Sequence, residues 1–391
     1  MGMFDHLLGS KRWPIALDIG TDSIRMLQMH RVGRAIAVRA CWRWRFPASS
    51  AEDGEARRRL AVSAVRDALR GGGFRGNDAI SCLSCDQLKI KNIRLPRLGG
   101  ADLLEAVHDE ARERFGRSFT TDQLQYLRAG EIRQGLESQD EFILLAAPGE
   151  VVDAHYSMVR EMGLHIEHID AEPLAMFRPF ERHLRRRADE GFVSVIVDLG
   201  HSSTKVVVAG GRDLVLVKRI DIGGRDFIQA IAKQLNISHE EAGELRLQVT
   251  RERACDAGSQ EGPAGGNVDP GGVNWAIVDA VRGQVEELSR EIALCLRYCS
   301  VTFRGLRPER VTVTGGQAYD PGVIRLLNEH LGVECAVGQP LRGIDTSGVD
   351  LGGDRRGMLA EWSICAGLAL RSEQMERGAR KRSHGRDRLS A

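Results

Sequence analysis

The sequence predicts an α/β protein built from two related lobes. Its 391 residues, of which 42% are hydrophobic, suffice for two or three domains with separate cores. Strand-like and helix-like apolar patterns alternate along the chain. A strand-turn-strand pattern containing Asp, an apolar residue and Gly occurs at Asp18 and again 180 residues later at Asp198. This spacing is too long for a solenoid repeat and suits two lobes with a cleft between them.

Lobe I is expected at residues 1–190. Two strands at 15–19 and 24–29 flank the turn-forming residues 20–23. Further strands are expected at 35–44, 79–83, 88–95, 123–129, 142–147 and 165–169, and helices at 52–70, 101–115, 151–162 and 172–187. Pro96 and the glycine pair after it mark a boundary, so residues at about 97–169 are expected to form an inserted subdomain.

Lobe II is expected at residues 191–370 and begins with the second copy of the hairpin. Strands are expected at 193–200, 204–208, 214–220 and 311–314, and helices at 226–234, 238–247, 276–301 and 362–370. A subdomain at about 225–308 would contain a mobile loop at 254–274, where Gly and Pro are frequent and apolar residues rare. The basic residues 371–391 are expected to form a disordered tail.

Composition and charge narrow the functional class. The 55 Lys and Arg residues balance 54 Asp and Glu residues, so no overall field draws the chain to nucleic acid or to an anionic membrane. The sequence has neither a membrane-spanning apolar run nor a secretory signal, which predicts a cytoplasmic protein with reduced thiols. Cys82 and Cys85 have metal-like spacing, but no second pair completes a site, so two half-buried strand residues are the favoured interpretation.

Both hairpin turns are suited to binding phosphate, because they combine glycine with backbone N–H groups and hydroxyls. Facing each other across the cleft, they would hold the phosphates of one nucleotide. Asp18 and Asp198 would hold Mg²⁺ through water, since this ion takes one or two carboxylates and keeps several waters. Gly315, Gly316 and Gln317 follow a strand, where bare backbone can pass an adenine or a ribose. The Walker and Rossmann glycine patterns are absent.

Three motifs in this order resemble the phosphate-1, phosphate-2 and adenosine motifs of the actin, Hsp70 and sugar-kinase fold. They are residues 18–23, 198–204 and 314–316. Within that superfamily, roughly residues 12–370 are similar to the PilM family of type IV pilus assembly proteins, with further matching segments at 91–96, 169–175 and 219–224. The resemblance implies an actin-like two-lobed fold with an inserted subdomain as in FtsA, and ATP and Mg²⁺ as cofactors.

The resemblance also implies which residues bind the nucleotide. The expected phosphate-binding residues are Asp18, Gly20, Thr21, Asp22, Ser23, Arg25, Gly200, Ser202, Ser203 and Thr204. The expected ribose and adenine contacts are Gly223, Gly224, Glu244, Arg246, Gly315, Gly316 and Gln317.

Two positions depart from the family pattern. Arg25 stands where a Lys is usual, which keeps the charge but changes its reach and geometry. Gly243 stands where the family has a Glu that contacts the ribose. The next residue, Glu244, lies about 100° further around the helix than position 243. Glu244 therefore either takes over the ribose contact or is a solvated surface charge. We therefore predict weakened ATP binding, with an affinity weaker than micromolar.

The family implies a cytoplasmic, ATP-binding scaffold that is peripheral to the inner membrane through its partner. That partner is the cytoplasmic N-terminal segment of an inner-membrane PilN-like protein, and residues 75–91 with the inserted subdomain are the expected groove. Other pilus machinery proteins and further copies of the chain are additional candidate partners, whereas nucleic acid is not.

Enzymatic turnover is expected to be a weak ATPase activity at most. Glu172, close to Asp170, is the candidate general base of a kinase, but a carboxylate at the start of a helix more often satisfies backbone N–H groups. An FtsA-like membrane tether is the main alternative function, although residues 371–391 offer few apolar anchors. A small-molecule kinase of the same superfamily is a further alternative.

Overall fold

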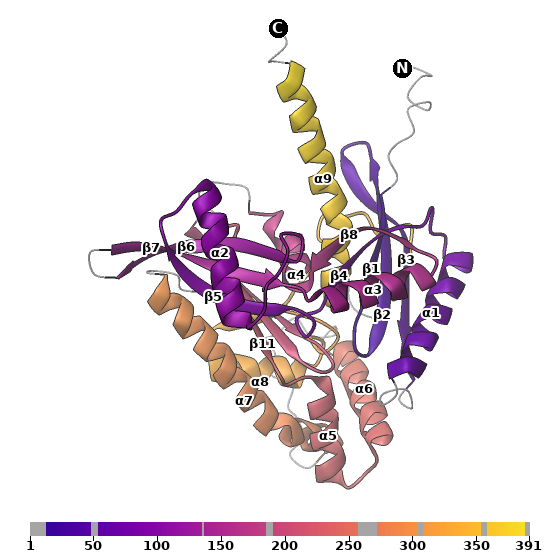
Figure 1. Cartoon of the computed structure of the whole chain (residues 1–391). Helices are drawn as coiled ribbons and strands as arrows, with labels where there is room; N and C mark the ends of the chain where they lie inside the picture. Colours follow the sequence, from indigo (N-terminus) through magenta and orange to yellow (C-terminus); the bar gives the residue numbers. More distant parts are fainter. Residues whose placement is uncertain are drawn as a thin grey trace.

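The computed structural model describes residues 13–47, 54–134, 137–184, 191–256, 272–303, 308–352 and 358–387. These residues form two five-stranded sheets and one three-stranded sheet, with helices against their faces (Figure 1). The strand orders are β3-β2-β1-β4-β8, β11-β10-β9-β12-β13 and β5-β7-β6. The predicted two-lobed α/β organisation is therefore confirmed.

The first sheet carries the N-terminal hairpin. Its strands are β1 (Ile15–Ile19), β2 (Ser23–Val32), β3 (Ala35–Arg45), β4 (Asp78–Leu83) and β8 (His165–Ala171), and its helices are α1 (Gly54–Gly71), α3 (Gly149–Glu161), α4 (Glu172–Glu181) and α9 (Ser363–Asp387). Strands β1 and β2 pair antiparallel, whereas β1, β4 and β8 run parallel. Because side chains alternate along a strand, Ile15 and Leu17 pack with α1 and α3, while Ala16 lies in the other core with α4 and α9.

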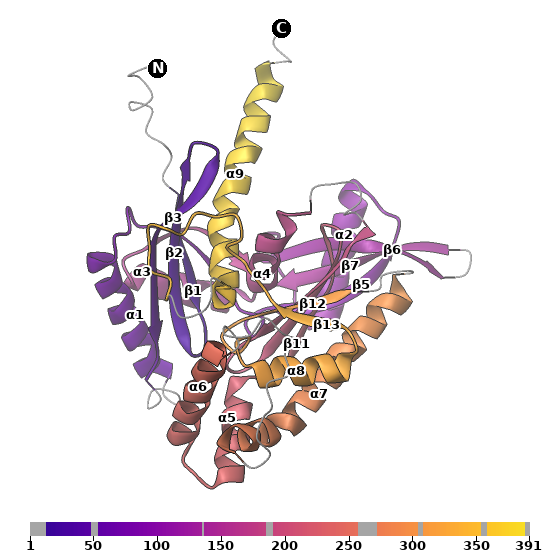
Figure 2. The ribbon, with the colours of Figure 1, turned by 180° about the vertical axis from the view of Figure 1, so that it is seen from behind.

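The second sheet repeats the plan of the first. Its strands are β9 (Val193–Leu199), β10 (Thr204–Gly210), β11 (Asp213–Ile220), β12 (Arg310–Thr314) and β13 (Glu334–Val337). Strands β9 and β10 pair antiparallel, and β12 adds parallel to β9, as β4 does to β1. The helices are α5 (Gly224–Leu235), α6 (His239–Asp256), α7 (Val273–Thr302) and α8 (Pro321–Leu331), with α8 beside α7 and β13 (Figure 2).

The third sheet is inserted in the chain between β4 and β8 of the first sheet. It consists of β5 (Lys89–Pro96), β6 (Leu124–Gln134) and β7 (Glu137–Ala146), with α2 (Gly100–Phe115) packed on it and β6 beside β11. The insertion expected at 97–169 differs from this unit at both ends. Strand β5 lies before residue 97 but belongs to this unit, because it pairs with β7. Strand β8 lies within 97–169 but belongs to the first sheet, because it pairs with β4.

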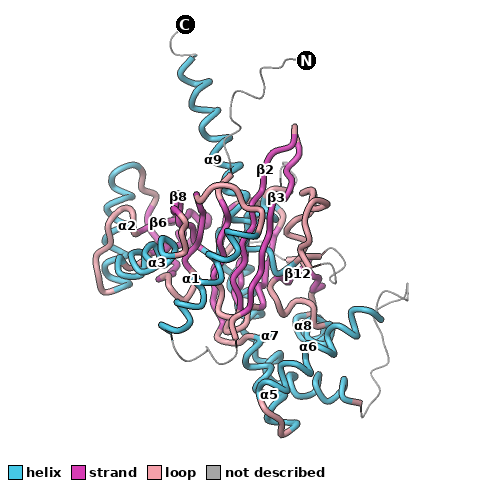
Figure 3. Tube along the Cα trace, turned by 90° about the vertical axis from the view of Figure 1, so that its right-hand side faces the viewer, coloured by secondary structure: helices cyan, strands magenta, loops and turns pink. Residues whose placement is uncertain are grey.

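The C-terminal tail corrects the expectation of disorder. Helix α9 runs from Ser363 to Asp387, and its end extends away from the sheets (Figure 3). Residues 371–387 contain five Arg together with Glu, Gln, Met, Ala and Lys, all of which are good helix formers. Extending a helix that is already anchored needs no new nucleus, so this composition continues it. The mobile loop predicted at 254–274 falls mostly on residues 257–271, which lie outside the described residues.

Helices α4 and α9 pack with almost no space between their backbones. A Cβ atom added to Gly367 would lie 2.6 Å from the carbonyl carbon of Ala175. Beside this contact, Arg178 Nη2 donates to Asp170 Oδ2 over 2.7 Å and Arg178 Nη1 donates to Gly367 O over 2.7 Å. Both charged side chains are buried, so an ion pair joins α4 to β8 and a hydrogen bond from the same guanidinium joins α4 to α9.

The cysteines described in the structure are free thiols, as expected for a chain without a disulfide frame. Cys82 and Cys85 are buried at the end of β4 and just after it. Burial raises the pKa of both thiols well above the ordinary value, which keeps them protonated.

A buried histidine makes lobe I sensitive to acid. His155 Nε2 lies 3.1 Å from Ser81 Oγ, and Ser81 in turn donates to Leu17 O. Burial lowers the pKa of His155 from 6.5 to about 4. Between these values the unfolded chain binds a proton that the folded chain does not, so stability falls as the pH decreases through this window.

We expect the free energy of unfolding to show this loss. Compared with a His155→Gln variant, the wild type should lose about 3 kcal/mol between pH 7.5 and pH 4, as a shift of more than two pKa units requires. Denaturant unfolding at several pH values measures the difference. If the difference in unfolding free energy between the wild type and His155→Gln were the same at every pH in this range, the lowered pKa of His155 would be wrong.

Candidate functional site

The two hairpin turns have the same local structure. Gly20 N–H donates to Ser23 O over 3.0 Å, and Gly200 N–H donates to Ser203 O over 3.2 Å. Asp18 pairs in register with Arg25, as Asp198 does with Lys205. The internal repeat therefore extends to the placement of one acidic and one basic residue on each hairpin.

The structure brings the tips of the two turns together. Thr21 Oγ1 donates a hydrogen bond to Ser202 Oγ over 3.1 Å. In the neighbouring position, His201 Nδ1 lies 4.0 Å from Asp22 Oδ1. Hydroxyl groups from both lobes thus converge on one place, although 181 positions separate Thr21 from Ser202 in the sequence.

A buried group of charges lies beneath the two turns. Arg25 Nη1 is 3.5 Å from Asp18 Oδ2. Lys205 Nζ is 3.2 Å from Glu172 Oε1 and 3.7 Å from Asp198 Oδ2. We call these five residues the charge cluster. None of their side chains is more than 14% exposed.

Glu172 has structural partners for both carboxylate oxygens. Oε1 faces Lys205, and Oε2 accepts a hydrogen bond from Cys85 N–H over 2.7 Å. Its neighbour in the sequence, Asp170, accepts from Arg178 and from the N–H of Ala171. A general base needs a free oxygen next to a substrate proton, so this arrangement favours a positioning role for both residues.

Burial dominates the titration of the charge cluster. It raises the pKa of Asp18 to about 6, although Arg25 opposes the shift, and Glu172 and Asp198 add to it. Burial also raises the pKa of Asp198, against the effect of Lys205. For Lys205, burial lowers the pKa, but Glu172 and Asp198 outweigh burial and raise it above its ordinary value. Lys205 therefore remains charged.

We expect Asp18→Asn to stabilise the ligand-free protein at neutral and higher pH. Because the folded-state pKa of Asp18 is about 6 and the ordinary value is 3.8, ionisation of Asp18 destabilises the fold increasingly as the pH rises between these values. The gain should approach about 3 kcal/mol above pH 7 and vanish below pH 4. Denaturant unfolding of both proteins at pH 4 and pH 8 measures it. A variant less stable than the wild type at pH 8 would show that burial of the Asp18 charge does not destabilise the fold.

Other elements hold the two turns in place. Arg57 on α1 donates to Gly20 O over 3.1 Å and also to Thr21 O. The second turn is held by the start of α5, where Gly224 N–H donates to Gly200 O over 3.0 Å. A Cβ atom at Gly223 would lie 2.6 Å from His201 O, so only glycine permits this close approach.

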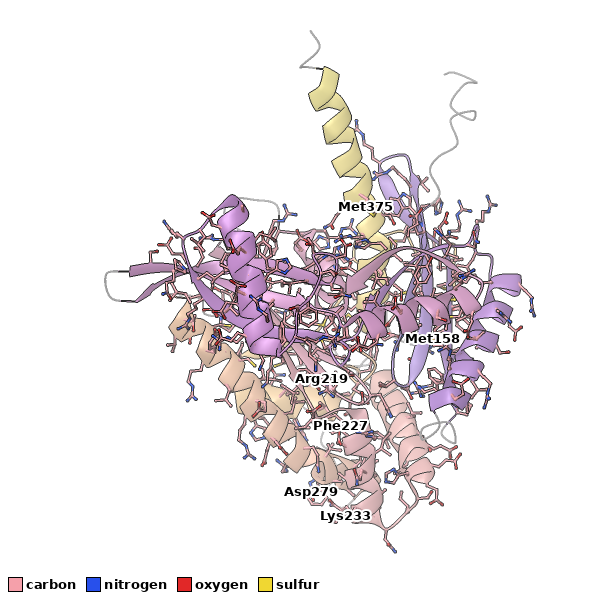
Figure 4. The ribbon with its side chains drawn as sticks, viewed as in Figure 1. Met158, Arg219, Phe227, Lys233, Asp279 and Met375 are labelled. Carbon is pink, nitrogen blue, oxygen red and sulfur yellow. The ribbon has the colours of Figure 1, made fainter. Side chains whose placement is uncertain are left out.

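The residues expected near the ribose and adenine form a second contact group. Arg246 on α6 donates to Gln317 Oε1 and pairs with Asp320 Oδ2 over 3.1 Å. A Cβ atom at Gly224 would lie 2.6 Å from the Gln317 amide. The Gln317 side chain, which accepts from Arg246, thus fills the space next to Gly224. The guanidinium of Arg246 also lies 5.0 Å from the ring centre of Phe227, which Figure 4 labels on α5.

The remaining expected contacts divide between buried and exposed positions. Gly315 has a φ of +89°, and a Cβ atom there would lie 2.5 Å from Leu199 O, so glycine is required where β12 meets β9. Ser23 and Thr204 are buried at the start of their strands, and Thr204 donates to Ile222 O. Gly316 and Glu244 are exposed, so Glu244 has the surroundings of a solvated charge.

Sequence reasoning missed two residues of the site, Lys205 and Arg57. Lys205 could have been found from the hairpin repeat, because it occupies the position that corresponds to Arg25. Arg57 is one of three consecutive arginines, and nothing in the sequence distinguishes the one that contacts the turn.

The site has the features of an anion site. Ser203 Oγ and Arg25 Nε are buried and have no hydrogen-bond partner within the described part of the chain. Such donors suit phosphate oxygens, which accept hydrogen bonds and carry negative charge. For a divalent ion the fit is poor, because each carboxylate already has a cation within 4 Å. Among the described residues, no group of three or more His, Cys, Asp or Glu side chains has the geometry to hold a metal.

Comparisons with known proteins agree with the order of the motifs. The family model described as type IV pilus assembly protein PilM matches residues 16–256. No curated protein matches the sequence. None of the helices in the described ranges combines the length and apolar character that crossing a membrane requires.

Several solved structures share the fold. A PilM-PilN type IV pilus biogenesis complex matches with a TM-score of 0.72 and 23% identity, over 92% of this chain and 98% of that chain. The ethanolamine utilization protein EutJ from Carboxydothermus hydrogenoformans matches with a TM-score of 0.51 and 14% identity, over 92% and 89%. MreB5 of Spiroplasma citri bound to ADP matches with a TM-score of 0.51 and 11% identity, over 95% and 99%. The expected actin-like fold is confirmed.

Proposed function

Because the chain belongs to the family of the type IV pilus assembly protein PilM, we propose that it is a nucleotide-binding scaffold of pilus assembly. The contact between Thr21 and Ser202 carries the nucleotide part of this proposal. It brings hydroxyl groups of both lobes together, which supports the binding of one polyphosphate to both turns. The solved MreB5 structure of similar fold is bound to ADP, which supports a nucleotide as the ligand.

Nucleotide binding is expected to be weak, with an affinity weaker than micromolar. Gly243 removes a carboxylate from the ribose side, and Glu244 is exposed. In addition, the Gln317 side chain, which Arg246 holds through a hydrogen bond, has to move before an adenosine can lie beside Gly224. Breaking the buried Arg246–Asp320 pair would reduce the net binding free energy further.

Ser203 provides the test of the nucleotide proposal. Its buried hydroxyl has no partner among the described residues, so Ser203→Ala removes a donor without breaking a hydrogen bond seen in the structure. We expect Ser203→Ala to weaken ATP binding about tenfold or more, since hydrogen bonds to charged groups contribute about 1.5–3 kcal/mol. Ser300→Ala on α7 is the matched control. Equal ATP affinity of the wild type and Ser203→Ala would contradict the proposal.

The proposed partner is the N-terminal cytoplasmic segment of an inner-membrane PilN-like protein, which would keep the chain peripheral to that membrane. The similar PilM-PilN complex supports this choice of partner. Of the groove expected at 75–91, β4 is unsuitable because it is an interior strand between β1 and β8. Residues 75–77 and 84–91 remain, and the second of these segments includes the start of β5 at the edge of the third sheet.

Binding of a synthetic PilN-type peptide tests the partner. Lys89 and Lys91 are exposed at the start of β5. We expect the double variant Lys89→Glu/Lys91→Glu to lose peptide affinity, whereas Lys233→Glu, at the far end of α5 in Figure 4, should keep it. Fluorescence anisotropy measures both. No peptide binding by the wild type would reject the partner, and equal losses in both variants would reject this location.

A further inference from the structure

Lys205 occupies an unusual position for a strand lysine. It is the second residue of β10 in the lobe II hairpin, directly opposite Asp198. Its side chain is only 12% exposed, and its Nζ atom lies between Glu172 on α4 and Asp198 on β9. A Cβ atom at Gly200 would lie 3.1 Å from Nζ. The ammonium therefore lies directly beneath the phosphate-binding turn.

The surroundings hold the ammonium in this place. Glu172 is fixed by the N–H of Cys85, which leaves its other oxygen directed at Lys205. Asp198 is fixed by Thr314 Oγ1, which donates to its Oδ1 over 3.1 Å, while its Oδ2 faces Lys205. Both carboxylates thus have one oxygen bound within the fold and one paired with the ammonium.

This arrangement conflicts with the Mg²⁺ expected at Asp18 and Asp198. A hydrated divalent ion needs carboxylate oxygens that are not already neutralised, and it keeps several waters around it. Here Arg25 pairs with Asp18, and Lys205 pairs with Asp198 and Glu172. A divalent ion at the same place would lie within a few ångströms of a buried ammonium, and their repulsion is strong where water is excluded.

We propose that Lys205 is a fixed cation that takes the place of a divalent ion between Asp198 and Glu172, so that polyphosphate binds this site without Mg²⁺. The second half of this statement rests on the proposed nucleotide-binding function. The first half does not, because it concerns only the charges of the protein. An ammonium is a compact charge with several donors, and lysines of this kind bind phosphate in other nucleotide sites.

A measurement with metal alone tests the first half of the proposal, that Lys205 takes the place of a divalent ion. We expect millimolar Mg²⁺ to leave the thermal midpoint of the wild type unchanged, compared with a monovalent salt of equal ionic strength. Lys205→Ala should have a lower midpoint, because it leaves two buried carboxylates unpaired, and Mg²⁺ should restore much of this loss by binding the folded state. A wild type stabilised by Mg²⁺ as strongly as the variant, or a variant that Mg²⁺ does not stabilise, would overturn the proposal.

A second metal measurement does not depend on the folding of the variant. Mn²⁺ titrated into the wild type and followed by electron paramagnetic resonance should show no binding at the charge cluster. Binding that disappears in Asp198→Asn would show that a divalent ion enters despite Lys205, and the proposal would then be wrong.

ATP binding measured in EDTA and in Mg²⁺ tests the second half of the proposal, that polyphosphate binds this site without Mg²⁺. The wild type is expected to bind ATP about equally well in both, whereas Lys205→Ala should bind about tenfold or more weakly in EDTA. A wild type that requires Mg²⁺ for ATP binding would contradict the inference. If the wild type binds no ATP in either condition, the proposed nucleotide function and this second half both fail, while the metal measurements still decide the first half.

Discussion

Replacing Gly367 by Ala is expected to destabilise the protein by about 3 kcal/mol or more, which is the upper range for overpacking a buried contact. The added Cβ atom would overlap the backbone of Ala175, whose carbonyl carbon is 2.6 Å away. Backbone atoms cannot rotate aside as a flexible side chain does. Helices α4 and α9 would have to separate, which would also disturb the hydrogen bond from Arg178 to Gly367 O.

Gly283 provides the matched control for this variant. It lies inside α7, is exposed, and has no atom within 4 Å of the position that a Cβ would take. Since Ala is the better helix former, Gly283→Ala should raise stability by about 0.5–1 kcal/mol. Thermal and denaturant unfolding compare the two variants. A Gly367→Ala protein as stable as the wild type would show that α4 and α9 are not in backbone contact.

Replacing Arg178 by Met is expected to cost about 3–5 kcal/mol, the range for removing one partner of a buried ion pair. The guanidinium is buried and joins Asp170, Gly367 O and Gln374. Methionine leaves the Asp170 carboxylate without its cation in a site closed to water. The loss should therefore be larger than the loss of hydrophobic contact alone, and denaturant unfolding measures it.

A double variant separates charge from packing at this site. Asp170→Asn in the Arg178→Met background removes the unpaired charge, so it should recover a large part of the lost stability. Arg70→Met, which breaks an exposed pair with Asp67, should leave stability unchanged. If the double variant were no more stable than Arg178→Met, burial of an unpaired carboxylate would not be the cause of the loss.

The hairpins were predictable because their signals are local. Apolar strand residues, Asp and a glycine turn lie within a few positions of each other, and the second copy repeats the pattern. The bounds of the third sheet were not predictable from the sequence, because β5 pairs with β7, about 50 residues later. Local patterns contain no information about a pairing of that range, so Pro96 looked like a boundary although it ends a strand of the inserted sheet.

The tail and the charge cluster show two further limits of the sequence. The basic composition after residue 370 indicated disorder, but its helix-forming residues continue a helix whose first half is buried. Lys205 resembled an ordinary charged residue at the start of a strand. Its importance comes from Glu172, which lies on an element of the other lobe and reaches it only in the folded structure.

A disulfide between the two turn tips tests the central claim, that both turns enclose one polyphosphate. In Thr21→Cys/Ser202→Cys the new thiols replace hydroxyl oxygens that are 3.1 Å apart. We predict that mild oxidation links them without ligand, and that saturating ATP slows the reaction because phosphate groups separate the tips. Mass spectrometry of the linked peptides measures the rate, with each single variant as control. A link that never forms, or that forms equally fast with ATP bound, would contradict the claim.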